Sequence, residues 1–209
     1  MMFPGNVTLL PPRGHASRGL ALAILVLAPF FFGALALWLG QDANWDLRNY
    51  HWYNAYAFLN GRDAIDLLPS QTPYFYNPLL DVPFYLLATH LPARVAGFIL
   101  GFVQGMNFCL LFMLAYASLG IFNLRWKVLV CGALAALGLL GGGGLAQIGT
   151  TFYDNVTSLG LFASALLVVR YAHLLRTPSR SAFLYAFAFG VPAGLMMGLK
   201  LPAVIFCLG

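Results

Sequence analysis

The residues best suited to chemistry lie in a polar, aromatic segment, 41–78, that follows the first long apolar stretch. Asp46 stands about six residues beyond that stretch, and a carboxylate there can accept a proton from an attacking hydroxyl group. Aromatic faces with a few polar groups between them are also suited to binding a sugar. Asp46 is therefore the candidate proton acceptor. The candidate binding residues around it are Asp42, Arg48, Tyr50 and Tyr53.

A structural role explains much of the same segment. Tyr50, Tyr53 and Tyr56 recur at helical spacing, which is typical of an amphipathic helix lying at a membrane surface with an aromatic belt. Arg48 can likewise bind an anionic lipid headgroup or pair with a nearby Asp. This alternative leaves the carboxylate and the histidine among the aromatic side chains unexplained, so both interpretations remain open.

Two further ionisable residues lie beside or within apolar stretches, where a charge at a helix centre costs about 2.5–3.5 kcal/mol. Asp154 stands between two such stretches and is expected to cap the following helix, to serve a site, or both. Lys200 follows more than fifteen uncharged residues, and it can extend to the lipid headgroups or act as a point charge for a phosphate. Arg94 can bind an anionic headgroup or pair with an Asp.

Metal, nucleotide and nucleic-acid chemistry have little support in the sequence. The chain has no Glu, no D-x-D and no H-x-x-x-H pattern, so we expect no divalent metal site. It lacks a P-loop and a G-x-G-x-x-G pattern, and its charges are too sparse for a phosphate-tracking surface. The three cysteines lie in apolar runs without C-x-x-C spacing. We therefore expect no cofactor and no nucleic-acid partner.

The elements that must position these residues are membrane helices. The chain has 209 residues, 61% hydrophobic and 8% charged, with a mean hydropathy of +0.81, whereas a soluble globular chain is about 25% charged. Apolar runs of about 20 residues cross a bilayer as helices, so the sequence predicts an all-α polytopic membrane helix bundle with about five spans. The first loop, 41–92, is expected to be external and to contain short amphipathic helices. The expected spans are 19–40, 93–122, 128–148, 156–175 and 181–209.

The distribution of charges predicts the orientation of these spans. With the N-terminus in the cytoplasm, most Lys and Arg residues lie on the cytoplasmic side, as the positive-inside rule requires. Every Asp then falls on the outer side, which assigns any acid chemistry to the extracytoplasmic face. Because the chain ends inside an apolar stretch, we expect it to be the N-terminal part of a longer multi-span protein.

Four short sequence features occur one after another along the chain. They are Asp46 soon after the first helix, L-P-A-R at 91–94, Y-D-N-V-T-S-L at 153–159 and G-L-M-M-G-L-K-L-P at 194–202. Their order and common sidedness resemble the N-terminal part of the GT-C superfamily of membrane glycosyltransferases, which includes protein O-mannosyltransferase and aminoarabinose-transferase-like enzymes. The chain departs from that family at Leu47, where a second acid is common, and at Leu199, where a Thr precedes the lysine.

The resemblance implies an enzyme that moves a sugar from a polyprenyl-phosphate carrier to an acceptor hydroxyl outside the cytoplasm. It implies a multi-pass protein of the bacterial inner membrane whose partners are membrane lipid, the lipid-linked donor and an acceptor. By this resemblance Asp46 is the general base, Asp154 holds the acceptor or the catalytic loop, and Lys200 with Arg94 holds the carrier phosphate. A transporter or lipid flippase, or an inactive membrane fragment, are the alternative interpretations.

Overall fold

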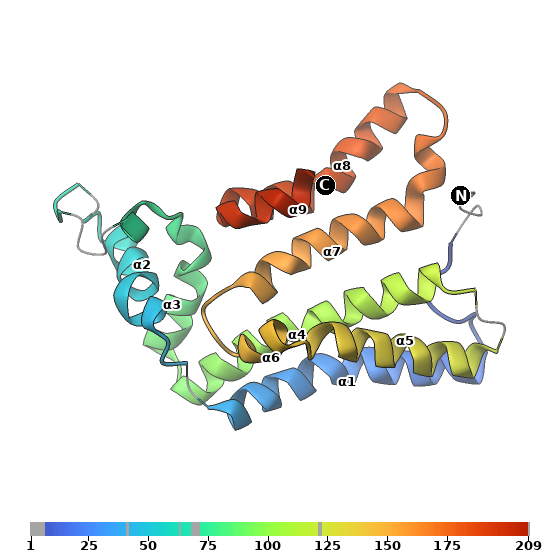
Figure 1. Cartoon of the computed structure of the whole chain (residues 1–209), viewed down its shortest axis with the longest axis horizontal. Helices are drawn as coiled ribbons and strands as arrows, with labels where there is room; N and C mark the ends of the chain where they lie inside the picture. The colour runs from blue at the N-terminus through green and yellow to red at the C-terminus, as the bar shows by residue number, and fades with distance from the viewer. Residues whose placement is uncertain (1–6, 41, 63, 68–71, 121–122, 209) are drawn as a thin grey trace.

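In the computed structural model, residues 7–40, 42–62, 64–67, 72–120 and 123–208 are described. Every regular element among them is a helix, which confirms the all-α prediction. Four of these helices are long and apolar enough to cross a membrane (Figure 1). They are α1 (Ala16–Leu39), α4 (Ala93–Ser118), α7 (Asp154–Tyr171), which continues through the 3-10 turn η4 (Ala172–Leu175), and α8 (Arg180–Leu199).

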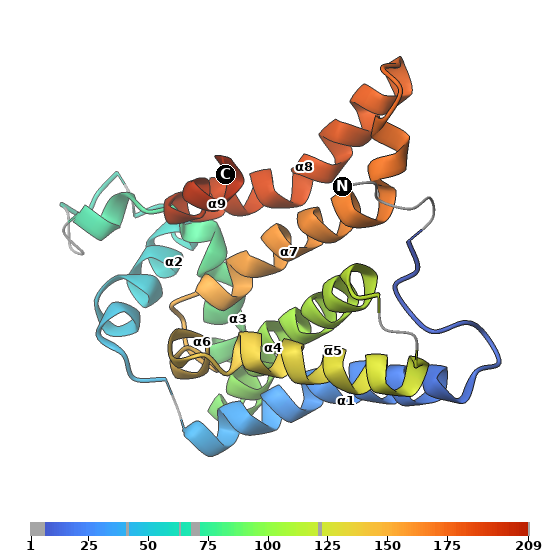
Figure 2. The same cartoon turned by 45° about the vertical axis from the view of Figure 1, so that its right-hand side comes forward.

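The helix α4 lies at the centre of the bundle. It packs against α1, α7 and the shorter α5 (Leu124–Leu139), while α8 packs against α7 (Figure 2). The α1–α4 pair approaches closely at Gly101, where an added Cβ would lie 2.5 Å from the Cβ of Ala36. Small residues let membrane helices meet at backbone distance. The side chains of Phe32 and Phe112 belong to the buried apolar core beside this contact.

The third predicted span, 128–148, is not one continuous helix. The helix α5 ends at Leu139 after 16 residues and is followed by the short α6 (Gly142–Ala146). At about 1.5 Å per residue α5 reaches about 24 Å, less than the ~30 Å hydrocarbon core. The run of four glycines at 141–144 explains the break, because each glycine costs a helix about 1 kcal/mol relative to alanine. Among the described residues, four helices rather than five therefore meet the requirements of a span.

The last apolar stretch, predicted over 181–209, is also interrupted. The helix α8 ends before Lys200, whose backbone is extended. The chain then continues as η5 (Leu201–Ala203) and α9 (Val204–Leu208). Pro202 has no N–H to donate to the carbonyl of Gly198, four residues earlier, and that carbonyl accepts a hydrogen bond of 2.8 Å from the side chain of Asn77. This hydrogen bond links the end of α8 to Asn77, which is far away in the sequence.

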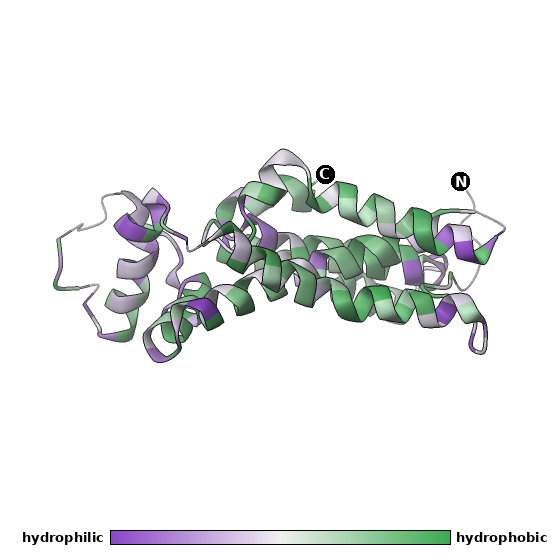
Figure 3. Cartoon of the chain, turned by 90° about the horizontal axis from the view of Figure 1, so that it is seen from below, coloured by the Kyte–Doolittle hydropathy of each residue, from purple (hydrophilic) through white to green (hydrophobic). Residues whose placement is uncertain are grey.

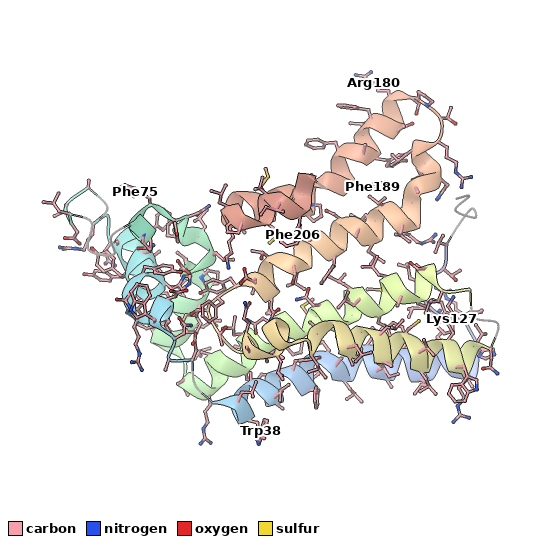
Figure 4. The ribbon with its side chains drawn as sticks, viewed as in Figure 1. Trp38, Phe75, Lys127, Arg180, Phe189 and Phe206 are labelled. Carbon is pink, nitrogen blue, oxygen red and sulfur yellow. The ribbon has the colours of Figure 1, made fainter. Side chains whose placement is uncertain are left out.

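A polar cap, formed by the described residues of 42–92, covers one end of the long helices. Its elements are the π-helix η1 (Leu47–His51), α2 (Trp52–Leu59), η2 (Thr72–Phe75), η3 (Pro78–Leu80) and α3 (Val82–His90). Figures 1 and 2 both draw it beside the start of α7 and the end of α8. Hydrophilic colours gather at the two ends of the molecule and hydrophobic ones between them (Figure 3). Lys127 and Arg180 lie at the end opposite the cap residue Phe75 (Figure 4).

Candidate functional site

A cavity of about 560 Å³ lies between the polar cap and the ends of α7 and α8. Its lining includes Asp46, Tyr50, His51 and Asp81 from the cap, Phe152 and Tyr153 from the turn before α7, and Lys200, Leu201 and Pro202 after α8. The cavity therefore collects carboxylates, phenols, an imidazole and an ammonium group that are far apart in the sequence. We call it the cap cavity.

A single turn of π-helix, η1, brings Asp46, Tyr50 and His51 to the cap cavity. In this turn the N–H of Trp52 donates to the carbonyl of Leu47, five residues earlier. Such turns are rare and recur at functional sites. Tyr50 is buried, and its pKa is raised first by that burial and then by the charge of Asp46 and a hydrogen bond to it. A neutral phenol is thus held beside the Asp46 carboxylate.

The lysine that follows α8 forms an ion pair across the end of the bundle. The ammonium of Lys200 donates to the carboxylate of Asp154 and to the backbone carbonyl of Phe152. Asp154 also accepts a hydrogen bond of 2.9 Å from Gln147. It is the first residue of α7, and the N-cap is Tyr153, so the possibility that Asp154 itself caps the helix is not realised. Its charge still lies at the positive end of the helix dipole.

A buried pair, His51 and Asp81, lies in the wall of the cap cavity. The Nδ1 atom of His51 is 2.6 Å from Oδ1 of Asp81, and their side chains are 11% and 5% exposed. Burial raises the pKa of Asp81, and the hydrogen bond from His51 is the main opposing effect. Sequence reasoning did not select either residue for the site. The available signal was Asp81 itself, the one acid in the apolar stretch 79–92.

Tyr153 also lines the cap cavity and was missed from the sequence. Among the described residues it is the one non-glycine with a positive φ, 62°; such left-handed backbone costs about 1–3 kcal/mol and is typical of functional sites. Tyr153 is 3% exposed, and its ring lies edge-on to that of His51, 5.1 Å between centroids. Burial, and then the nearby charge of Asp81, raises the pKa of Tyr153. Its hydroxyl makes no hydrogen bond of good geometry with a described residue.

Asp42 and Arg94 lie outside the cap cavity. Both line a separate cavity of about 390 Å³ between the end of α1, the start of α4 and the cap helices. Oδ2 of Asp42 accepts hydrogen bonds of 2.8 Å from both the backbone N–H and the hydroxyl of Thr151. Both carboxylate oxygens also accept from the side chain of Asn44, at 2.7 and 2.9 Å. Asp42 thus ties the end of α1 to the turn before α7.

Arg48 and Tyr53 are also placed elsewhere. Arg48 is exposed and lines a shallow hollow beside Trp52. The hydroxyl of Tyr53 donates to Asp66, which also forms a two-pronged ion pair with Arg62, with N–O distances of 2.6 and 2.7 Å. Of the residues selected from the sequence, the structure therefore gathers three in the cap cavity and a fourth beside it. The three are Asp46, Tyr50 and Lys200, and the fourth is Asp154.

Within the described part of the chain, no three His, Cys, Asp or Glu side chains lie close enough together to hold a metal ion. Two of the acids near the cap cavity are instead paired with nitrogen-containing side chains. Asp81 is paired with His51, and Asp154 with Lys200. The cavity is therefore suited to proton transfer and anion binding by side chains.

Comparison with known proteins returned no match. The chain matches no protein-family model, no curated protein and no solved structure. The resemblance to GT-C glycosyltransferases therefore remains a prediction from four short motifs. Function has to be argued from the residues and geometry of the cap cavity.

Proposed function

We propose that this chain carries the reaction site of a GT-C-type glycosyltransferase. The enzyme would transfer a sugar from a polyprenyl-phosphate carrier to an acceptor hydroxyl on the extracytoplasmic side of the bacterial inner membrane. One observation carries the proposal: Asp46 and Lys200 are far apart in the sequence, yet they line one cavity at the polar end of an apolar helix bundle. In such a cavity the carboxylate can bind the attacking hydroxyl, and the ammonium group can stabilise the departing phosphate.

The chemistry requires a bound hydroxyl, a proton acceptor and a stabilised leaving group. Asp46 receives the hydrogen bond of the acceptor hydroxyl and is the candidate proton acceptor. Lys200 has three N–H donors, of which Asp154 and the Phe152 carbonyl occupy two. The third is available to a phosphate oxygen. A lipid phosphate is a competent leaving group, so orientation and one base can suffice without a nucleotide.

An apolar groove beside the ion pair supports a lipid-linked donor. This groove, of about 460 Å³, lies between α5–α6 on one side and α7 with α9 on the other. Asp154 and Pro202 stand at its polar end, and its walls include Gly143, Leu161 and Phe206. A polar headgroup at Lys200 can therefore continue into an apolar chain lying in this groove. Arg94 lines a different cavity, so we assign the carrier phosphate to Lys200 without it.

The test measures transfer in membranes that contain the full chain. Undecaprenyl phosphate carrying radiolabelled mannose, glucose or aminoarabinose is supplied separately, with a membrane extract as the source of acceptors. We expect one donor to lose label from the lipid fraction to a non-lipid or larger-lipid product. Asp46→Asn should slow that transfer about 10²–10⁴-fold, and Lys200→Gln should raise the donor KM about 10–100-fold.

Matched controls separate these effects from general damage. Asp66→Asn removes a carboxylate from the cap outside the cavity, and Lys127→Gln removes an ammonium from the opposite end of the bundle. Both should transfer sugar at the wild-type rate. Wild-type transfer by Asp46→Asn would remove Asp46 from the proton-acceptor role, and failure of every lipid-linked donor would refute the proposed function.

A further inference from the structure

The hydrogen bond between His51 and Asp81 has a defined donor and acceptor. A buried carboxylate can accept hydrogen bonds but cannot donate one when ionised, so the proton of a neutral imidazole belongs on Nδ1, facing Asp81. The lone pair of the ring then lies on Nε2. This atom makes no hydrogen bond with any residue that the structure describes, and His51 lines the cap cavity. The ring that carries this basic nitrogen lines the same cavity as Asp46 and Lys200.

We propose that His51 is a further catalytic residue of this site, taking the proton of the acceptor hydroxyl on Nε2 while Asp81 holds the ring. This inference rests on the proposed function and changes its proton step: Asp46 binds and orients the hydroxyl, and His51 replaces Asp46 as the group that takes the proton. The acceptor O–H bond breaks and its oxygen bonds to the anomeric carbon of the sugar. The bond from that carbon to the phosphate oxygen breaks, and its electron pair leaves with the lipid phosphate. The proton stays on the imidazole as an imidazolium until water removes it.

Three features favour this role over a purely structural hydrogen bond. An imidazole is a stronger base than an ordinary carboxylate, and the Asp81 charge stabilises the imidazolium that forms. Burying the Asp81 carboxylate opposes its ionisation, so a stability role alone would be served as well by an apolar pair. Tyr153, whose backbone is strained, packs its ring edge-on against that of His51, and its buried hydroxyl lies near Asp81, so the pair is enclosed on this side.

A first experiment tests the nitrogen without relying on transfer activity. Diethylpyrocarbonate acylates accessible, unprotonated imidazole nitrogens, and mass spectrometry of peptides identifies each labelled histidine. We expect His51 to be labelled in the full chain, and undecaprenyl phosphate to slow that labelling several-fold. The exposed His90 on α3 is the internal control and should label at the same rate with or without the lipid. An unlabelled His51 beside a labelled His90 would overturn the inference.

A second experiment tests the proton step with the active donor. His51→Gln keeps an N–H that can donate to Asp81 but cannot hold a proton, and kcat should fall about 10²–10⁴-fold with little change in the donor KM. Asp81→Asn should lower kcat at least about tenfold, since an amide can reverse the ring tautomer. Added imidazole should partly restore His51→Ala but not Asp46→Ala, a result that a structural role would not produce. His90→Gln should match the wild type.

The outcomes separate this inference from the proposed function. Wild-type kcat in His51→Gln, with Asp46→Asn inactive, would overturn the role of His51 and leave the glycosyltransferase proposal standing. If the wild type transfers no sugar, the proposed function fails, and the labelling alone then decides whether His51 presents a basic nitrogen to the cavity. Labelling that undecaprenyl phosphate does not slow would contradict a place for His51 beside the lipid-linked substrate.

Discussion

Replacing Asp42 by asparagine should destabilise the junction between α1 and the turn that precedes α7. The carboxylate accepts two hydrogen bonds of 2.8 Å from Thr151 and two further bonds from the side chain of Asn44. An asparagine keeps the shape of the side chain but replaces one acceptor oxygen by an NH₂ group, which faces donors. If the NH₂ group replaces Oδ2, both bonds from Thr151 and one from Asn44 are lost; if it replaces Oδ1, two bonds from Asn44 are lost, one of them from its backbone N–H. The substitution also removes the charge.

The magnitude follows from the number and kind of bonds lost. A hydrogen bond to a charged group contributes about 1.5–3 kcal/mol. Two such bonds would give up to about 6 kcal/mol, but Asp42 is half-buried and water can replace part of what is lost. We therefore expect a loss of about 3 kcal/mol in the free energy of unfolding. On the scale of 2–4 °C per kcal/mol for chains of about 200 residues, the midpoint should fall by about 6–12 °C.

The assay can use a cysteine of the chain. Cys131 is fully buried, whereas Cys109 and Cys207 are partly exposed. In a background with Cys109→Ala and Cys207→Ala, a fluorogenic maleimide should therefore label Cys131 only when the bundle unfolds in a detergent micelle. Thr151→Val removes one neutral hydroxyl and should cost about 1–2 kcal/mol. The double variant Asp42→Asn, Thr151→Val should be less destabilised than the sum of the single variants, since the two residues share one interaction. Arg48→Gln, at an exposed side chain, serves as the neutral control.

Two results would refute this reasoning. A fall of less than about 1 °C in Asp42→Asn would mean that the bonds to Thr151 do not stabilise the bundle in the membrane protein. Strict additivity of the two substitutions would mean that they act independently, contrary to the 2.8 Å contacts. Either result would favour the sequence-based prediction that Asp42 binds substrate over a structural role for this residue.

Three other substitutions test separate parts of the structure. Asp66→Asn should lower the melting temperature at pH 7 but not near pH 2. The hydrogen bond from Arg62 is the largest of the effects that lower the pKa of Asp66 to about 2. The ionised carboxylate therefore stabilises the fold above the ordinary carboxyl pKa, and this stabilisation is lost as the pH falls through the lowered pKa of the folded protein. Gly101→Leu should destabilise by at least about 1–3 kcal/mol through overpacking against α1, whereas Gly132→Leu, with open space around it, should have little effect in the same thermal assay. Gln104→Leu should cost about 2–4 kcal/mol in that assay, because it leaves a buried backbone N–H and a carbonyl without their partner.

The positions of the long helices were largely predictable from the sequence. Three apolar stretches begin and end within a few residues of α1, α4 and α7, whereas the predicted span 181–209 begins near α8 but continues ten residues past its end at Leu199. The physical reason is strong: a backbone in hydrocarbon must satisfy its own hydrogen bonds, and a helix does so locally. The breaks after α5 and α8 carry local signals, the glycine run at 141–144 and Pro202. Sequence alone did not show that these signals outweigh the apolar pattern around them.

The sequence by itself determined which ionisable groups stand near one end of the helices, because residue type and position along an apolar span are local properties. Asp46 and Lys200 could be selected in this way. Tertiary structure alone decided their partners: His51 meets Asp81 across 30 residues and Asp42 meets Thr151 across 109. The sequence does not distinguish an Asp that forms hydrogen bonds between two helices from an Asp that lines a cavity. Packing of distant segments makes that difference, since it sets which donors reach each carboxylate and which side remains open to a ligand.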